Sequence, residues 1–147
     1  MKIFTTRSRE ETVALAKKLG QRLSGGEVIA YRGGLGAGKT AFTGGLAEGY
    51  GISCDVTSPT FAIVNEYTDG EKTLYHFDMY RIGDADELYS TGFFDYLDGS
   101  SVLAVEWSEN VDYALPEDTI YVDIKTIDES TREITISGEN FDDNSWD

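Results

Sequence analysis

The chain has 147 residues, of which 27 are Asp or Glu and 12 are Lys or Arg, so its formal charge at pH 7 is −15. This charge excludes a protein that grips nucleic acid over a broad basic surface, because phosphate contacts need clustered Lys and Arg. It leaves room for one local anion site. Hydrophobic residues make up 40% of the chain, which is enough for the core of one compact domain.

The cysteine content and the apolar segments bear on the compartment. Cys54 is the single cysteine, so it forms no internal disulfide, which favours a reducing compartment. No apolar run approaches the roughly 18 residues that a membrane span needs. Residues 1–12 lack the apolar core of a signal peptide. We therefore expect a cytoplasmic protein that has no membrane partner.

The first half of the chain alternates helical and strand patterns. Ser8-Arg9-Glu10-Glu11 fits a capping box, and apolar residues then recur at helical spacing up to a stop at 24–26. The β-branched and aromatic segment 27–31 predicts a strand. A glycine-rich loop follows, and residues 40–50 predict a second helix.

The second half contains more strands. Residues 60–68 and 72–80 predict two strands joined by Asp69-Gly70, a strong hairpin signal. The later patterns predict one helix over 84–97, a strand at 102–105 buried on both faces, and strands at 119–127 and 133–137. This alternation indicates an α/β layered domain with a mixed sheet.

The glycine-rich loop carries the most specific motif. Residues 33–40, Gly-Gly-Leu-Gly-Ala-Gly-Lys-Thr, match G-x-x-x-x-G-K-[ST] between a predicted strand and a predicted helix. Glycines allow positive φ and bring successive amides to an anion, and the helix N-terminus adds the positive end of its dipole. A flexible turn with a surface lysine is the alternative, which the strand–loop–helix context disfavours.

The motif predicts a nucleoside triphosphate site. Lys39 supplies a point charge for the outer phosphates, and the Thr40 hydroxyl can ligate Mg²⁺. The predicted nucleotide-binding residues of the loop are Gly33, Leu35, Gly36, Ala37, Gly38, Lys39 and Thr40. We expect a P-loop NTPase-like three-layer domain over 1–138, whose sheet is mostly parallel with one antiparallel hairpin. We expect the acidic tail 139–147 to be disordered.

Three further residues are candidates for the second half of the site. Glu106 directly follows the apolar strand, where P-loop enzymes carry an acid that holds Mg²⁺. An exposed strand-end carboxylate is the alternative. Trp107 could shield the site or simply pack. Thr60 lies where switch proteins place a hydroxyl that senses the γ-phosphate, although Ser-Pro-Thr is also an ordinary turn.

A polar row follows one predicted strand. Strand alternation places His76, Asp78 and Tyr80 on one face. Asp78 could orient the attacking water or bind a metal-bound water, and His76 could donate to Asp78. Arg81 could pair with a partner protein. A solvated hairpin face is the alternative.

Four segments together resemble one known family. They are GLGAGKT at 34–40, SPTF at 58–61, HFDMYR at 76–81 and VEW at 105–107. Their order and spacing resemble those of TsaE, the small ATPases of bacterial tRNA threonylcarbamoyladenosine biosynthesis, over nearly the whole chain. Gly34 departs from the family pattern, which usually has Asp there.

The resemblance implies ATP as substrate and Mg²⁺ as cofactor. It implies that Thr40 and Glu106 hold the metal, that Asp78 and Thr60 serve hydrolysis beside Lys39, and that Ser8 and Arg9 lie against the nucleotide. It also implies a TsaD-type transferase subunit and its TsaB-type paralogue as partners. The strong acidity favours contact with tRNA only through that complex.

We therefore expect an ATPase that is slow without its partners and supports repeated turnover of the modifying complex. Two alternatives remain. A small-molecule P-loop kinase would need an arginine-bearing lid, which is not apparent in the sequence. A nucleotide-gated module would assemble its partners without hydrolysis. A GTPase is disfavoured because no N-K-x-D motif is present.

Overall fold

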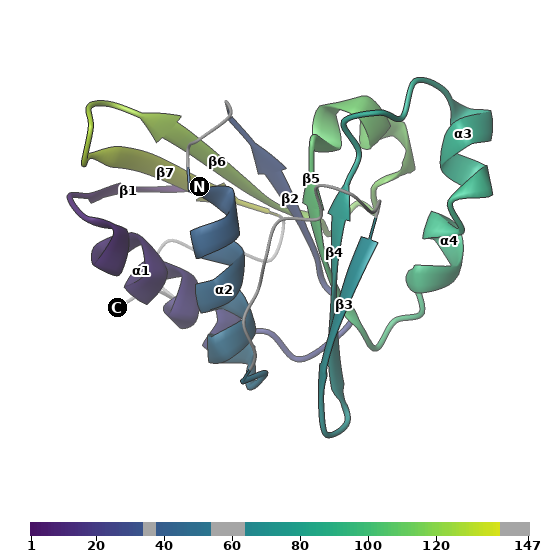
Figure 1. Ribbon diagram of the computed structural model, residues 1–147, viewed down its shortest axis with the longest axis horizontal. Helices are drawn as coiled ribbons and strands as arrows, with labels where there is room; N and C mark the ends of the chain where they lie inside the picture. Colours follow the sequence, from purple (N-terminus) through teal and green to yellow (C-terminus); the bar gives the residue numbers. More distant parts are fainter. Residues whose placement is uncertain (34–37, 54–63, 139–147) are drawn as a thin grey trace.

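The computed structural model describes residues 1–33, 38–53 and 64–138, and seven strands of this part form one sheet in the order β1-β7-β6-β2-β5-β4-β3 (Figure 1). The strands are β1 (Lys2–Thr6), β2 (Val28–Arg32), β3 (Val64–Asp69), β4 (Lys72–Asp78), β5 (Val102–Glu106), β6 (Ile120–Thr126) and β7 (Arg132–Ser137). The expected tail 139–147 lies outside the described residues.

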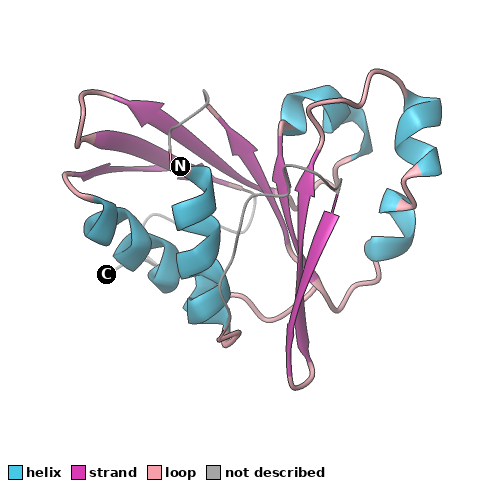
Figure 2. Cartoon of the chain, in the orientation of Figure 1, coloured by secondary structure: helices cyan, strands magenta, loops and turns pink. Residues whose placement is uncertain are grey.

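The helices form two groups on opposite sides of the strands (Figure 2). They are α1 (Arg9–Gln21), α2 (Lys39–Tyr50), α3 (Ala85–Ser90), α4 (Phe93–Tyr96) and the 3₁₀ helix η1 (Ser108–Ala114). None of the described helices is both long and apolar enough to cross a bilayer.

Parallel and antiparallel pairing occupy different parts of the sheet. The central strands β6, β2, β5 and β4 pair in parallel, whereas β1-β7-β6 and β3-β4 pair antiparallel at the two sides. The predicted mixed α/β sheet is confirmed. Antiparallel pairing extends beyond the predicted hairpin. Strands β6 and β7 form a second antiparallel hairpin, and β1 pairs antiparallel with β7.

Each face of the sheet buries its own apolar cluster. The cluster under α1 and α2 includes Leu19, Ile29, Tyr31, Phe42 and Leu46, all essentially inaccessible to solvent. The cluster under α3, α4 and η1 includes Val28, Phe77, Phe93, Leu103 and Val105. Successive residues of β2 and β5 therefore contribute to opposite layers, which explains why these strands are continuously apolar.

Helices α1 and α2 run parallel and lie unusually close together. A Cβ at Gly45 would lie 2.6 Å from the Val13 carbonyl oxygen, and a Cβ at Gly49 would lie 2.2 Å from the Lys17 carbonyl oxygen. In both contacts the two residues are 32 positions apart (45 − 13 and 49 − 17). The same spacing, continued back along both helices, relates their first turns. It places Arg9, at the start of α1, level with Ala41 in the first turn of α2.

Several predicted boundaries differ from the structure. Strand β1 was not predicted, because its five residues become a strand only by pairing with β7. The single helix expected over 84–97 is wrong, since Gly92 adopts φ 79° and separates α3 from α4. The second strand of the hairpin ends at Asp78 rather than at Tyr80. Residues 60–63 of its first strand lie outside the described part.

The predicted start of α1 is confirmed. Ser8 is the N-cap, and its Oγ accepts a hydrogen bond from the Glu11 amide at 3.1 Å. The Glu11 carboxylate reaches back to the amide of Arg7 rather than to that of Ser8. Two amides at the start of the helix are thereby satisfied, as in a capping box shifted by one residue.

Candidate functional site

Several of the predicted site residues lie at one edge of the sheet. The parallel strands β2, β4 and β5 end at this edge, and Asp78 and Glu106 are direct partners in the register of β4 and β5. Helix α2 begins beside the same edge (Figure 1). In α/β sheets, ligands bind outside the carboxyl ends of parallel strands where the connections diverge, as those after β2 and β5 do here.

Two glycines frame the loop between β2 and α2. Gly33 has φ 122°, and a Cβ there would lie 2.2 Å from the Ile124 carbonyl oxygen, so the position accepts only glycine. Gly38 has φ 100° and caps α2 without a side-chain hydrogen bond. No side chain at the cap position therefore accepts from the first amides of α2, and amides at a helix start are the groups that an anion site uses. The predicted residues Leu35, Gly36 and Ala37 lie outside the described part, as does Thr60.

Lys39 and Thr40 open helix α2. The Lys39 side chain is 7% exposed, and its ammonium lies 5.3 Å from the centroid of the Trp107 ring. This contact is a cation–π interaction that holds the charge at the sheet edge. Thr40 is half-buried in the same turn.

Trp107 has an unusual backbone. With φ 58° and ψ 40°, it is the only residue other than glycine with positive φ in the described part. The Trp107 ring contacts the Lys39 ammonium and also the Tyr80 ring, whose centroid lies 4.9 Å away. Trp107 therefore packs and also borders the site, while Tyr80 and Arg81 are exposed beyond the end of β4.

The two carboxylates have different surroundings. Asp78 is half-buried, and its Oδ1 accepts a hydrogen bond from the Tyr80 amide at 2.9 Å. The Glu106 side chain is 13% exposed, and its Oε2 lies 2.6 Å from Nε2 of His76, which is fully buried. The expected donation from His76 to Asp78 is wrong, because the imidazole lies against Glu106. The row was not a solvated face either, since only Tyr80 is exposed.

A buried hydroxyl pair joins α2 to β2 beneath the loop. The hydroxyls of Tyr31 and Thr43 are hydrogen-bonded at 2.7 Å, and Thr43 donates to the Lys39 carbonyl at 2.8 Å. Complete burial raises the pKa of Tyr31, and the nearby charge of Glu106 raises it further. The phenol therefore stays protonated and neutral beside the carboxylate.

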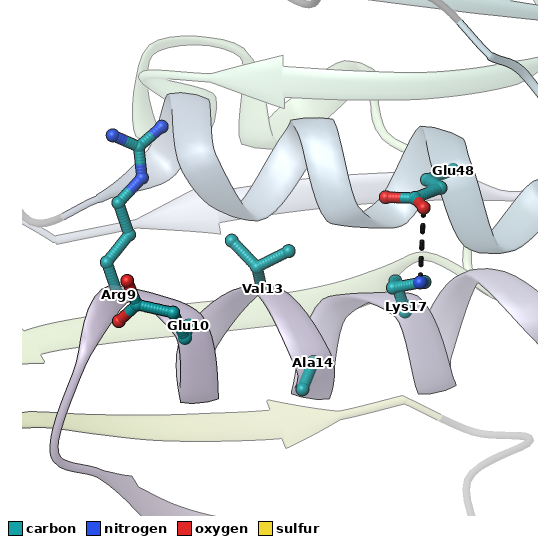
Figure 3. A pocket seen from close by; sticks show the side chains of 6 residues that line it. All are labelled: Arg9, Glu10, Val13, Ala14, Lys17 and Glu48. Atoms are coloured by element: carbon teal, nitrogen blue, oxygen red, sulfur yellow. Dashed lines mark ion pairs between the residues drawn. The ribbon is translucent and has the colours of Figure 1, made fainter.

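Ser8 and Arg9 were predicted to lie against the nucleotide. They belong to the start of α1, which approaches α2 from the side away from Glu106 and Trp107. Arg9 lines an open hollow of about 350 Å³ between α1 and α2, together with Glu10, Val13, Ala14, Lys17 and Glu48. In Figure 3 the Arg9 guanidinium extends toward the start of α2, while the 3.1 Å ion pair between Lys17 and Glu48 closes the other end. The structure thus brings Arg9 near the first turn of α2, whereas the Ser8 side chain caps its own helix.

The donor set suits magnesium bound with a nucleotide. In residues 1–33, 38–53 and 64–138, no group of three or more His, Cys, Asp or Glu side chains could hold a metal ion. Mg²⁺ characteristically takes one or two carboxylates and completes its shell with phosphate oxygens and water. Glu106, with one oxygen turned to the buried His76, and the Thr40 hydroxyl fit that pattern.

Most of the chain matches the model of one known family. The family model described as "Threonylcarbamoyl adenosine biosynthesis protein TsaE" matches residues 6–134. The chain belongs to the TsaE family. The matched residues span the chain from the end of β1 to β7, and they include Lys39, Asp78 and Glu106.

Individual members of the TsaE family are similar to this chain over most of its length. The chain is 43% identical to the tRNA threonylcarbamoyladenosine biosynthesis protein TsaE of Bacillus subtilis, over 91% of this chain and 84% of that protein. It is 37% identical to the protein of the same name from Treponema pallidum, over 90% of this chain and 97% of the other. The crystal structure of Bacillus subtilis YdiB superposes with a TM-score of 0.79 at 38% identity, covering 93% of this chain and 84% of that one.

Some residues of the site in this TsaE-family chain were not predicted from sequence. Tyr31 and Thr43 link α2 to the sheet, and Asn110 fixes the turn after β4 by donating from Nδ2 to the Met79 carbonyl at 2.9 Å. Arg32, at the end of β2, forms an ion pair with Asp112 of η1. The one available signal was Tyr31, a hydroxyl-bearing residue in an apolar strand directly before the loop.

Proposed function

We propose that this protein is a magnesium-dependent ATPase that acts in the threonylcarbamoyl modification of adenosine in tRNA. The observation that carries the proposal is the entry to α2. Gly33 and Gly38 turn the chain so that the uncapped helix start and Lys39 lie at the edge where Glu106 emerges. Membership in the TsaE family supports the pathway.

Each residue of the edge has a distinct role in the proposed reaction. The free amides of α2 and Lys39 bind the phosphates, and Thr40 and Glu106 hold Mg²⁺, which neutralises phosphate charge when bound. Asp78 orients a water for in-line attack on the γ-phosphorus. The water oxygen bonds to the γ-phosphorus as the bond from phosphorus to the β–γ bridging oxygen breaks, the proton that water loses passes to the released phosphate or to solvent, and ADP and phosphate leave. Thr60 remains proposed as a hydroxyl that senses the γ-phosphate.

The proposed partners are a TsaD-type transferase subunit and a TsaB-type paralogue, with tRNA bound through them. The charge distribution supports this division of labour. Between Arg81 and Lys125 the sequence contains no Lys or Arg, and this stretch forms α3, α4, β5 and η1. The segments α3, α4 and η1 on one side of the sheet therefore contribute acidic and no basic side chains, which disfavours contact with a polyanion there. Arg81 and the exposed Tyr80 ring, next to the nucleotide edge, are the proposed partner contacts.

The test is ATP hydrolysis with and without the transferase pair and tRNA. We expect slow hydrolysis by the chain alone, a faster rate in the complex, and a loss of about 100-fold or more for Glu106→Ala. Glu109→Ala is the matched control, because it removes the same charge from an exposed position three residues on. Equal rates for the two variants would refute the metal assignment.

Two other experimental results would each refute the ATPase proposal and identify a different function. Wild-type protein that binds ATP and its partners but hydrolyses nothing in the complex would identify a nucleotide-gated assembly module, provided that Lys39→Ala abolishes partner binding. Transfer of phosphate to a metabolite faster than to water would identify a kinase.

A further inference from the structure

His76 is a buried polar residue that the proposed reaction does not use. It is the only histidine in the chain, and its side chain is 0% exposed in β4. Leu74, two residues earlier on the same face, belongs to the apolar cluster under α1 and α2. Neither imidazole nitrogen has an aligned hydrogen-bond partner within the described part of the chain. Burying such a group costs free energy that a leucine at this position would avoid.

The neighbouring strand explains where the ring points. His76 is paired in register with Ala104 of β5, whose small side chain is fully buried. The imidazole can therefore pass over Ala104 toward the next residue on that face, Glu106. Its Nε2 lies 2.6 Å from Glu106 Oε2. A carboxylate accepts hydrogen bonds and does not donate them, so a hydrogen bond between these two atoms requires the neutral imidazole to carry its proton on Nε2.

One oxygen of Glu106 is thus placed by a buried neighbour. The side chain of His76 is 0% exposed, and its Nε2 lies against Oε2 of Glu106 on the sheet side. The carboxylate has one buried oxygen, Oε2, which also lacks an aligned hydrogen bond. The Glu106 side chain as a whole is 13% exposed, so it is not sealed off from the edge of the sheet. Carboxylates that bind metals are generally oriented by such outer partners.

We propose that His76 is a positioning residue for Glu106, whose Nε2–H directs Oε2 inward so that the other carboxylate oxygen faces the nucleotide-bound metal. The role of Glu106 as metal ligand rests on the proposed function. The contact between the imidazole and the carboxylate is independent of the proposed function. Each of the two claims can therefore be refuted while the other stands.

The contact is tested without nucleotide or metal. Protein labelled with ¹⁵N-histidine gives the imidazole signals of one residue, so no assignment is needed. We expect a single tautomer with the proton on Nε2, and a changed Nε2 shift in Glu106→Gln. Glu109→Gln is the matched control and should leave the shift as in wild type. A proton on Nδ1, rapid exchange between tautomers, or an unchanged spectrum in Glu106→Gln would overturn the proposal.

The consequence for the metal is tested by nucleotide binding at varied Mg²⁺. We expect His76→Leu to raise about 10-fold or more the Mg²⁺ concentration at which Mg²⁺ gives half of its maximal enhancement of nucleotide binding. The nucleotide affinity measured without Mg²⁺ should be unchanged. His76→Gln, which can place an N–H near the position of Nε2, should restore most of the loss. Leu74→Val is the matched control, because it perturbs the same face of the same strand without touching Glu106.

The outcomes remain decisive if a variant is unstable. Should His76→Leu fail to fold, the wild-type spectrum and the His76→Gln titration carry the test. Equal Mg²⁺ dependence in wild type and in a folded His76→Leu would overturn the positioning role. Wild-type protein that binds no nucleotide would refute the proposed function and the metal role together, while the spectra would still decide whether His76 holds Glu106.

Discussion

Gly44 and Gly45 are neighbours in α2, yet alanine at these two positions should have opposite effects on stability. In a helix interior, Gly→Ala stabilises by about 0.5–1 kcal/mol, because alanine loses less backbone entropy on folding. A Cβ at Gly44 meets no described atom within 4 Å. Gly44→Ala should therefore be more stable than wild type by about 0.5–1 kcal/mol.

Gly45 faces α1 and has no such room. A Cβ there would lie 2.6 Å from the Val13 carbonyl oxygen and 2.8 Å from the Ala16 Cβ, neither of which can swing away as a flexible side chain would. Val13 points toward α2 in Figure 3. Overpacking of this kind costs about 1–3 kcal/mol. Subtracting the intrinsic gain of alanine leaves Gly45→Ala less stable than wild type by up to about 2.5 kcal/mol, with a central value of about 1 kcal/mol.

Urea unfolding followed by circular dichroism measures both variants. The two midpoints should move in opposite directions with unchanged slopes, and the melting temperatures should differ from wild type by roughly 2–4 °C per kcal/mol. A Gly45→Ala variant as stable as Gly44→Ala would show that α1 and α2 do not pack this closely. The register that brings Arg9 to the first turn of α2 would then be lost as well.

Two further predictions concern a buried hydroxyl and a surface carboxylate. Tyr31→Phe removes the hydrogen bond with Thr43 but leaves Thr43 bonded to the Lys39 carbonyl, so urea unfolding should show a loss of about 0.5–1.5 kcal/mol; no loss would exclude the buried bond. Hydrogen bonds from the backbone amides of Ser100 and Ser101 lower the pKa of Asp98 to about 2, below its value near 4 in the unfolded chain. The charge of Asp98 therefore stabilises the fold fully above about pH 4, and this contribution is lost as the pH falls through 2. Wild type should therefore exceed Asp98→Asn in stability at neutral pH by a margin that shrinks between about pH 4 and 2, and a margin independent of pH would contradict this reasoning.

Local sequence signals predicted the parts of the fold that depend on local physics. The Ser8 cap, the apolar strand that leads to Glu106 and the hairpin itself all match the structure, because capping, apolar runs and turn glycines act within a few residues. The hairpin turn lies at Gly70-Glu71, one residue later than predicted, since Asp69 still pairs with Lys72. Strand β1 escaped prediction because its pairing partner, β7, lies at the other end of the chain. The break at Gly92 escaped because the apolar spacing on both sides of it still suits one helix.

The amino-acid order alone determined the loop motif, the family resemblance and the candidate acids, since these are patterns of residue type along the chain. The tertiary structure alone decided which groups surround each acid. His76 and Glu106 are thirty positions apart and meet only because β4 and β5 pair in parallel with His76 opposite the small Ala104. Arg9 reaches the first turn of α2 only because glycines let two helices touch. Register between distant strands and close approach between helices are set by burial of the whole core, which no local pattern contains.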